Sequence, residues 1–355
     1  MTTPVPPVDP TGVLGDLGAD ATRLSELATA SPAPLLPGRV SRSERVGADV
    51  LTAEGSILAA TTETVCTGDW VVVDRAGDPP RIVAVLERRT ALVRRSADED
   101  TAQLLATNVD EVWIVVPLDR PVGPERIERA LVLAWESGAL PVLVATKADL
   151  ATPDEIGDAV TVLGSAGPGT PAVVVSASTG SGIAALESRL GRGRSVALLG
   201  ASGAGKSSLI NALAGADVVD VGAVLASDSK GRHTTAWREL VLVPAGGVLI
   251  DSPGLRAVGM WIDDGGIDAA FSDVAELAAQ CRFNDCAHET EPGCAVTAAI
   301  AAGDLDPRRL ESYRKLRREA AWAERRNDAR AAAAERRIWA ARSRDAKERA
   351  RHRDR

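Results

Sequence analysis

The sequence predicts a multi-domain α/β protein with three successive regions, and the arrangement of apolar residues carries this prediction. Short β-type runs separated by Gly, Asp and Pro turns fill residues 38–95. Apolar strand-like runs then alternate with amphipathic helix-like segments over residues 104–261, which is typical of a mostly parallel sheet covered on both faces. Ala-rich and charged helical segments follow from about residue 267. A chain of 355 residues with 45% hydrophobic content is long enough for two or three domains.

The N-terminal segment is expected to be a disordered tail over residues 1–36, with at most a short helix near Leu24–Ala30. It is rich in Pro, Ala, Gly and Thr and shows no hydrophobic period. It does not resemble a signal peptide, and no apolar run approaches the length of a membrane span. Three of the four cysteines lie within residues 281–294, which favours a reducing compartment over a disulfide framework. We therefore expect a cytoplasmic protein.

A small β-barrel is predicted over residues 37–97. The short strands and frequent turns of this range make an OB-fold the natural candidate. Barrels of this kind often bind oligonucleotides, but a barrel that serves only as a spacer would show the same pattern. The fold alone therefore assigns no function to this region.

The next region, residues 98–262, contains the pattern of a phosphate-binding loop. The stretch GASGAGKS matches G-x-x-x-x-G-K-[ST] and stands between an apolar strand and a helix. The backbone N–H groups and the helix dipole of such a loop bind phosphate, while Lys206 bridges the β- and γ-phosphates and Ser207 ligates Mg²⁺. The predicted phosphate-binding residues are Gly200, Ala201, Ser202, Gly203, Ala204, Gly205, Lys206, Ser207 and Ser208.

Two stretches after this loop have the composition of nucleotide switches. GRHTT ends with Thr234 and Thr235, and DSPG runs from Asp251 to Gly254 after an apolar strand. Asp251 can hold a water of the Mg²⁺ shell, and the Gly254 N–H can meet the γ-phosphate. A threonine of the pair, with Thr235 preferred, can offer an oxygen to the same Mg²⁺ ion.

The stretch TKAD resembles a guanine-reading loop at the end of an apolar strand. The carboxylate of Asp149 can accept hydrogen bonds from N1–H and the N2 amine of guanine. Adenine offers neither donor, which argues against an ATP-using enzyme. The stem of Lys147 can lie along the base. Thr146 replaces the usual Asn and lacks the amide that ties this loop to the phosphate loop, so guanine preference is expected and affinity is left open. Farther on, Ser176 and Ala177 resemble the loop that meets guanine O6.

The order of these motifs indicates a circular permutation. An ordinary GTPase begins with its phosphate loop and ends with its guanine loops, whereas here both guanine motifs come first. The ends of a compact domain often lie close together, so such a rearrangement can leave the sheet unchanged. The sequence therefore predicts a circularly permuted P-loop GTPase domain.

The last region, residues 263–355, is predicted to be a helical domain with one metal site. Its pattern C-x4-C-x-H-x5-C offers three thiolates and one imidazole, a set suited to a closed tetrahedral Zn²⁺ site. Soft ligands without an open position indicate a structural ion. The predicted ligands are Cys281, Cys286, His288 and Cys294. The remaining cysteine, Cys66, is expected to belong to the barrel core.

These residues together resemble the ribosome small subunit-dependent GTPase A family. The resemblance runs from about Pro37 to the C-terminal helix and includes the segment GDWVVV, the junction Asn108-Val109-Asp110, the permuted motif order and the Cys₃His spacing. It implies an OB-fold domain, a circularly permuted GTPase domain and a zinc-containing helical domain. It also implies slow GTP hydrolysis stimulated by the small ribosomal subunit during its late maturation.

The candidate catalytic residues are Lys206 and His233. Leu255 stands where other GTPases place a water-orienting Gln, and an apolar side chain cannot position the attacking water, so slow intrinsic turnover is expected. His233 is the nearest polar candidate in sequence, and a histidine that only packs or binds RNA is the alternative. A nucleotide-gated clamp on ribosomal RNA, in which hydrolysis is incidental, also stays open as a second function.

The C-terminal tail is basic, with 18 Lys and Arg against 8 Asp and Glu from Pro307 to Arg355. A solvated helix would show the same composition, but the resemblance implies ribosomal RNA as a polyanionic partner. The residues expected to face it are Arg308, Arg309, Arg314, Lys315, Arg317 and Arg318, beside Tyr313 and Trp322. The expected partners are the small subunit, its rRNA and GTP or GDP, with no membrane and no obligate oligomer.

Overall fold

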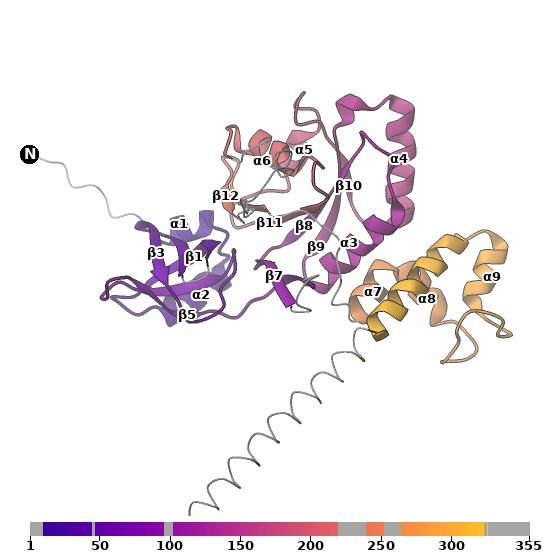
Figure 1. Ribbon diagram of the computed structural model, residues 1–355, viewed down its shortest axis with the longest axis horizontal. Coiled ribbons are helices and arrows are strands. Elements are labelled where there is room, and N and C mark those ends of the chain that lie inside the picture. The colour runs from indigo at the N-terminus through magenta and orange to yellow at the C-terminus, as the bar shows by residue number, and fades with distance from the viewer. Residues whose placement is uncertain are drawn as a thin grey trace, which may run out of the picture.

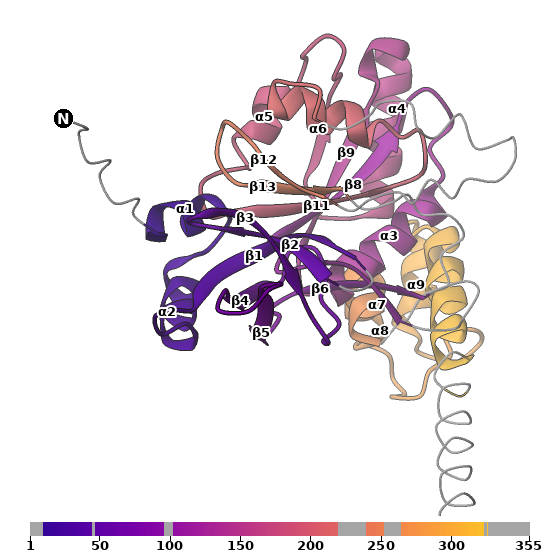
Figure 2. The same ribbon diagram turned by 60° about the vertical axis from the view of Figure 1, so that its left-hand side comes forward.

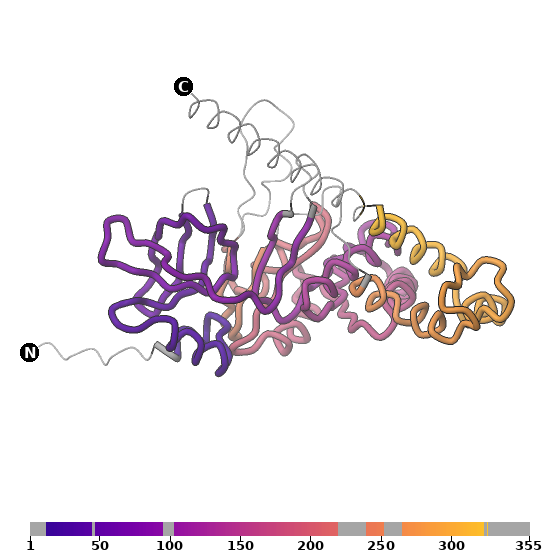
Figure 3. Tube along the Cα trace, turned by 90° about the horizontal axis from the view of Figure 1, so that it is seen from below, coloured from indigo at the N-terminus to yellow at the C-terminus, as the bar shows by residue number. Residues whose placement is uncertain are grey.

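The computed structural model describes residues 10–44, 47–95, 102–218, 239–251, 264–322 and 325. A barrel, a central sheet with helices on both faces, and a helical region follow one another across the molecule (Figures 1 and 3). The predicted fold class is confirmed. Among the described residues, no helix is both long enough and apolar enough to cross a membrane.

The barrel is closed and five-stranded. Its strands are β1 (Leu36–Ser43), β2 (Gly47–Thr52), β3 (Gly55–Ala60), β4 (Trp70–Asp74) and β5 (Arg81–Val85). They follow the order β1-β2-β3-β5-β4 around the barrel, and β3 and β5 are the parallel pair. Inward-facing side chains, largely valine and alanine, fill the interior because successive residues of a strand point to opposite faces. This topology fits the expected OB-fold.

The N-terminal segment differs from the expected disordered tail from Pro10 onward, while the short helix expected near Leu24–Ala30 is present within α2. It forms α1 (Pro10–Asp16) and α2 (Ala21–Ala30) before β1 begins. Leu17 and Leu27 are buried in one cluster with Trp70 of the barrel, so the two short helices gain stability from packing and not from length. Asp20 caps α2 by accepting a hydrogen bond from the Arg23 backbone N–H at 2.7 Å. Frequent Pro, Ala and Gly concealed this pattern in the sequence.

A two-stranded hairpin of β6 (Ala91–Arg95) and β7 (Ala102–Thr107) follows the barrel. Leu92 and Leu105 are buried in the same cluster as one face of the central sheet. The boundary expected between residues 97 and 98 therefore falls inside a hairpin that packs with the sheet. The polar stretch SADEDT lies between the two strands in the sequence, next to that expected boundary.

The central sheet has six strands in the order β10-β9-β8-β11-β13-β12. Their bounds are β8 (Glu111–Pro117), β9 (Leu140–Thr146), β10 (Ala172–Val174), β11 (Ser195–Gly200), β12 (Leu240–Leu242) and β13 (Val248–Asp251). Only β12 runs antiparallel to its neighbour. Because the other strands are parallel, their carboxyl ends meet at one edge of the sheet. Ligands bind at such an edge in open α/β sheets.

Helices cover both faces of this sheet. On one face lie α3 (Pro124–Glu136) and α4 (Pro153–Ala166), and on the other lie α5 (Ile183–Glu187) and α6 (Lys206–Ala214). The two faces form separate hydrophobic clusters. Both faces of the inner strands are therefore covered, which explains why β8 and β11 are buried along their whole length and read as continuous apolar runs.

The helical region packs on the α3 side of the sheet (Figure 2). It contains α7 (Asp264–Ala270), α8 (Ser272–Ala278), α9 (Ala295–Ala302) and a further helix over residues 307–322. Helix α7 lies against α3, and the buried Phe271 and Tyr313 rings lie 5.7 Å apart in the same core. The helical region thus shares one hydrophobic core with the central domain.

Candidate functional site

The phosphate loop connects the carboxyl end of β11 to the first turn of α6. Gly203 and Gly205 have φ angles of 73° and 92°, which side chains with a Cβ rarely adopt. A Cβ at Gly200 would lie 2.7 Å from the carbonyl oxygen of Val115 on β8. Three glycines of the motif are thus required by the backbone, and the loop lies at the edge of the sheet where the strand ends meet.

Lys206 folds back into this loop. Its Nζ donates hydrogen bonds to the carbonyl oxygens of Gly200 at 2.9 Å and Ala201 at 3.2 Å, and only 9% of the residue is exposed. Burial lowers the pKa of Lys206, and the charge of Asp251 at the end of β13 partly opposes that shift. A phosphate would give this buried cation anionic oxygens in place of carbonyl oxygens.

Asp251 has a buried carboxylate oxygen, Oδ1, without a hydrogen-bond partner among the described residues. Burial raises the pKa of Asp251. A Mg²⁺ ion, or a water molecule bound to it, is a partner that such a carboxylate oxygen can take. The orphaned oxygen, together with the hydroxyl of Ser207 on α6, therefore suits a Mg²⁺ ion bound with the phosphates.

Thr146 joins the guanine loop to the phosphate loop. It is the last residue of β9, and its hydroxyl donates a 2.6 Å hydrogen bond to the carbonyl oxygen of Ala204. Sequence analysis noted that Thr146 lacks the Asn amide and left the nucleotide affinity open. The structure shows that the threonine hydroxyl on β9 reaches the phosphate loop directly.

Lys147 extends over the same loop. It has a φ of 62°, and its Nζ lies 2.6 Å from Oδ2 of Asp119 in the segment after β8. A Cβ at Gly205 would lie 3.9 Å from Cε of Lys147, so the aliphatic stem lies close to the phosphate loop. The charge of Lys147 is held by a carboxylate that the motif did not reveal, and the contact of its stem with a base stays a prediction.

Asp149 and Ser176 face each other across the two guanine loops. The Ser176 hydroxyl donates a 2.6 Å hydrogen bond to Oδ1 of Asp149, and the Ala148 N–H donates to the Val175 carbonyl oxygen at 3.2 Å. Hydrogen bonds from Ser176 and then Ser178 hold the pKa of Asp149 below its usual range. The carboxylate is therefore ionised at neutral pH and can accept from a base.

A hollow of about 590 Å³ lies between these loops and α6. Its walls include Ala177, which was predicted, and Ser178, Asn211 and Asp217, which were not. Ser208 in the first turn of α6 also lines it. Volumes of this order are typical of small-molecule sites. Polar residues one or two turns beyond a motif have no spacing rule, which is why the sequence did not single them out.

Several predicted residues lie outside the described part of the chain. These are His233, Thr234, Thr235, Gly254 and Leu255. Their assignments to the switches, to Mg²⁺ and to catalysis stay predictions. Asp251 is the one switch residue that the structure places, and it lies beside the phosphate loop.

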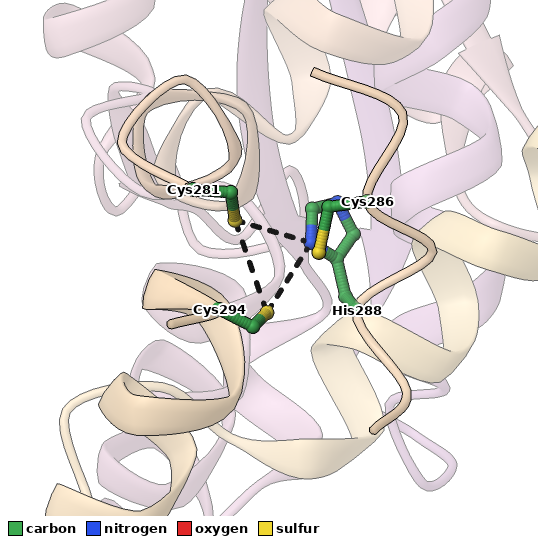
Figure 4. A group of neighbouring side chains, drawn as sticks. All are labelled: Cys281, Cys286, His288 and Cys294. Atoms are coloured by element: carbon green, nitrogen blue, oxygen red, sulfur yellow. Dashed lines mark hydrogen bonds between the residues drawn. The ribbon is translucent and has the colours of Figure 1, made fainter. Parts of the chain in front are cut away.

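The four predicted metal ligands converge between α8 and α9 (Figure 4). Their ligand atoms all lie within 4.8 Å of one another. His288 Nδ1 is 3.5 Å from the sulfurs of Cys281 and Cys294, and these sulfurs are 3.8 Å apart. Tetrahedral zinc with bonds of about 2.3 Å to sulfur and 2.0–2.1 Å to nitrogen requires nearly these separations. The cluster can therefore hold a tetrahedral metal ion.

The loop that carries these ligands is held by residues outside the motif. Arg314, on the helix over residues 307–322, donates to the carbonyl oxygens of Ala287 and His288. The Glu291 carboxylate accepts three backbone N–H bonds in the same loop. His288 itself has a φ of 59°, so the loop is bent at a ligand. Such supporting contacts orient the ligands of a metal site.

The basic residues of the C-terminal helix differ from the expected RNA-facing set. Arg309 is 2% exposed and pairs with Glu128 and Asp273, so the expectation that it contacts RNA is wrong. Arg314 supports the metal loop, as described above. Lys315 and Arg318 are exposed. The spacing of residues along the helix could not show which of these basic side chains are buried and which are exposed, because the carboxylates on α3 and α8 determine this.

Comparison with known proteins identifies the family. The family model for the RsgA GTPase matches residues 85–261. The Small ribosomal subunit biogenesis GTPase RsgA of Streptomyces coelicolor is 49% identical over 317 residues, which cover 86% of each chain. The chain belongs to the RsgA GTPase family. The protein of the same name from Streptomyces avermitilis is 48% identical over 91% of this chain and 90% of its own. The resemblance inferred from the motifs is confirmed.

Solved structures agree with this membership of the RsgA GTPase family. YjeQ from Thermotoga maritima has a TM-score of 0.60 and 28% identity, and the match covers 81% of this chain and 99% of that one. YloQ, a circularly permuted GTPase, has a TM-score of 0.58 at 20% identity and supports the fold. The permuted order predicted from the motifs is therefore confirmed, and membership makes this chain a GTPase.

Proposed function

We propose that this chain is a slow GTPase that binds the small ribosomal subunit, assists its late maturation and is stimulated by it. The observation that carries the proposal is the Thr146–Ala204 hydrogen bond, which brings the guanine loop against the phosphate loop at one edge of the sheet. The relatives at 48–49% identity are named as small ribosomal subunit biogenesis GTPases. On this proposal the protein acts in the cytoplasm, where ribosomes are assembled.

The proposed GTP site uses both halves of the permuted domain. Asp149 reads N1–H and the N2 amine of guanine, Lys147 covers the base, and Ser176 with Ala177 closes the far side. Residues 200–208 surround the phosphates, with Lys206 on the β- and γ-phosphates. Support comes from the loop geometry and from the ionised state of Asp149.

Two metal ions belong to the proposal. Mg²⁺ accompanies GTP, with Ser207 and Thr235 as ligands and Asp251 holding a bound water, and it supplies neutralisation of charge that develops on the phosphates. A structural Zn²⁺ is held by the Cys₃His cluster. His233 remains the proposed catalytic residue of the first switch, and Gly254 the proposed γ-phosphate contact of the second.

We also propose a revised division of the chain. The barrel ends after β5, and the hairpin of β6 and β7 belongs to the GTPase domain, because the buried side chains of the hairpin lie in that domain's core. The GTPase domain continues to residue 262, and residues 263–355 form the zinc domain with its basic helix.

The test measures GTP hydrolysis by the purified protein with and without purified small subunits, with ATP as competitor. The proposal predicts slow basal turnover, faster turnover with subunits, and no suppression by ATP. Tight GTP-dependent subunit binding without stimulation would favour the alternative, a nucleotide-gated clamp on rRNA. Leu255, which cannot orient water, is the sequence feature that makes this outcome worth testing.

Guanine reading has a separate test in Asp149→Asn. Xanthine has a carbonyl where guanine has its N2 amine, so an amide donor at this position should favour xanthosine triphosphate and weaken GTP binding. Asp154→Asn, at the exposed first turn of α4, is the matched control and should retain GTP. Unchanged GTP affinity in Asp149→Asn would remove the guanine assignment.

A further inference from the structure

The segment between β8 and α3 carries a charged pair that the nucleotide motifs do not include. Asp119 Oδ1 lies 2.8 Å from Nε of Arg120, and Asp119 Oδ2 lies 2.6 Å from Nζ of Lys147. One carboxylate therefore holds both the lysine of the guanine loop and a neighbouring arginine. These two cations, Arg120 first, hold the pKa of Asp119 at about 2, so the carboxylate is ionised throughout the neutral range.

Arg120 lies beside the phosphate loop. A Cβ at Gly203 would be 3.9 Å from Nη2 of Arg120, which places the guanidinium next to the middle of the loop. Gly200 and Ala201 line one cavity together with Arg120. Arg120, which comes from another strand connection, thus lies next to Gly203 and lines the same cavity as two further residues of the phosphate loop.

The guanidinium keeps capacity for a further anion. Its side chain is 47% exposed, and the ion pair with Asp119 engages Nε and, more weakly at 3.3 Å, Nη2. Nη1 has no hydrogen-bond partner within the described ranges. An arginine can bind two phosphate oxygens at once because its donors form a planar fork. A nucleotide triphosphate on the loop would place such oxygens near Gly203.

A cation at this position has a mechanistic use. Charge accumulates on the phosphate oxygens as the γ-phosphoryl group is transferred, and an arginine supplied by the same chain or by a partner can stabilise it. Lys206 approaches the phosphates from the interior of the loop. The chain therefore has room for a second cation on the outer side of the phosphates.

We propose that Arg120 is a catalytic arginine supplied in cis, which contacts the γ-phosphate of bound GTP, and that Asp119 positions it together with Lys147. This inference rests on the proposed GTPase function of the same site. Asp119 acts as a positioning residue: it holds Lys147 at the base and Arg120 at the phosphates from one point between the two loops.

The test compares Arg120→Ala with Arg126→Ala. Arg126 lines the same cavity from α3 and is also exposed, which makes it a matched control. Arg120→Ala is expected to lower kcat for GTP, with or without small subunits, by about 10–100-fold, less than a full arginine finger because Lys206 and Mg²⁺ remain. GDP affinity should change less than about threefold, since GDP lacks the γ-phosphate. Arg126→Ala should leave kcat, KM and GDP affinity within about twofold of the wild type.

Affinity measurements give a readout that does not need turnover. The preference of the wild type for a non-hydrolysable GTP analogue over GDP should fall in Arg120→Ala and be partly retained in Arg120→Lys. Asp119→Asn should weaken both nucleotides, because Lys147 loses its anchor. An unchanged kcat together with an unchanged analogue-to-GDP ratio in Arg120→Ala would overturn the proposal, and so would equal losses for both nucleotides.

These outcomes are distinguishable from failure of the proposed function. If the wild type does not hydrolyse GTP, the function fails, and the analogue-to-GDP ratio still decides whether Arg120 contacts the γ-phosphate. If the wild type hydrolyses GTP and Arg120→Ala does so equally well with an unchanged ratio, only the assignment of Arg120 fails. Arg120 is exposed, so its variants are expected to fold, and circular dichroism checks this.

Discussion

Arg39 lies where the barrel meets the central sheet, and Arg309 lies where the helical region meets the same sheet. Both are buried, at 0% and 2% exposure. Arg39 donates to neutral acceptors: the carbonyl oxygens of Leu17, Gly68 and Asn108, and the hydroxyl of Ser195. Burial lowers its pKa to about 9, and the charges of Asp110 and Asp69 oppose that shift without direct contact.

Arg309 is neutralised by carboxylates. It lies 3.2 Å from Glu128 on α3 and 3.0 Å from Asp273 on α8, and it also donates to two carbonyl oxygens. Its guanidinium lies 4.1 Å from the centre of the Phe271 ring. The comparison teaches that one residue type forms both joints by different physics. The barrel joint, the contact made by Arg39, depends on hydrogen bonds from one charged group to neutral acceptors. The helical joint, the contact made by Arg309, depends on ion pairs between opposite charges.

Removal of the metal should have the largest effect, and it should destabilise the helical joint without destabilising the barrel joint. Cys281→Ser followed by chelation is expected to remove stability on the order of 10 kcal/mol from the metal loop, as in small zinc-dependent folds. Hydrogen exchange should then show lost protection over residues 281–294 and 307–322, because Arg314 loses its carbonyl partners, while the barrel strands keep theirs. Cys66→Ala, in the barrel, is the control. Equal loss of protection at both joints would contradict the separation.

Arg309→Met should lower the free energy of unfolding more than Arg39→Met. It leaves Asp273 without its cation and leaves Glu128 with only Arg308, 3.0 Å away, and breaking a buried ion pair in this way typically costs about 3–5 kcal/mol. The free energy of unfolding from urea titration measures this. Arg318→Met, exposed on the same helix, should change stability by less than about 0.5 kcal/mol.

A double variant sharpens that result. Because the deficit comes chiefly from the unpaired Asp273 carboxylate, Arg309→Met with Asp273→Asn should recover part of the stability lost in Arg309→Met alone. A loss below about 1 kcal/mol in the single variant, or no recovery in the double variant, would show that the helical joint does not rest on charge.

Arg39→Met should cost less. It leaves neutral acceptors without a hydrogen bond, which typically costs about 1–3 kcal/mol. No ionised group that contacts Arg39 is left buried without its partner. Urea titration measures the loss, with Arg81→Met on the exposed side of the barrel as the control. The effects of Arg39→Met and Arg309→Met should add, because the two joints share no partner. A greater loss for Arg39→Met than for Arg309→Met would reverse the comparison.

Ser195→Ala should have the smallest effect, about 1 kcal/mol, because it removes one of four acceptors of Arg39. A double-mutant cycle with Arg39→Met should show coupling, since the hydroxyl loses its value once the guanidinium is gone. Ser165→Ala, exposed at the end of α4, is the matched control. Strict additivity of Ser195→Ala and Arg39→Met would mean that this hydrogen bond does not contribute to the joint.

The sequence predicted those parts of the site that local patterns determine. The phosphate loop, TKAD and the Cys₃His cluster each need particular residues at short spacing, because a loop or a metal constrains neighbouring positions. The pairs Arg39–Ser195 and Arg309–Glu128 join residues far apart in the chain, and no period or motif links them. Arg309 was wrongly expected to face RNA, because the sequence of a helix does not distinguish a buried arginine from an exposed one. The packing of the N-terminal helices was missed for a related reason: Trp70, on the fourth strand of the barrel, completes the core that buries their leucines.

Strand β11 begins at the barrel joint and ends at the nucleotide. Ser195, its first residue, accepts a hydrogen bond from Arg39, and Gly200, its last, opens the phosphate loop. Six residues of strand span about 20 Å. A displacement of the barrel at Arg39 would therefore act on the first residue of the strand that leads into the phosphate loop. One short strand is the lever arm between the two sites.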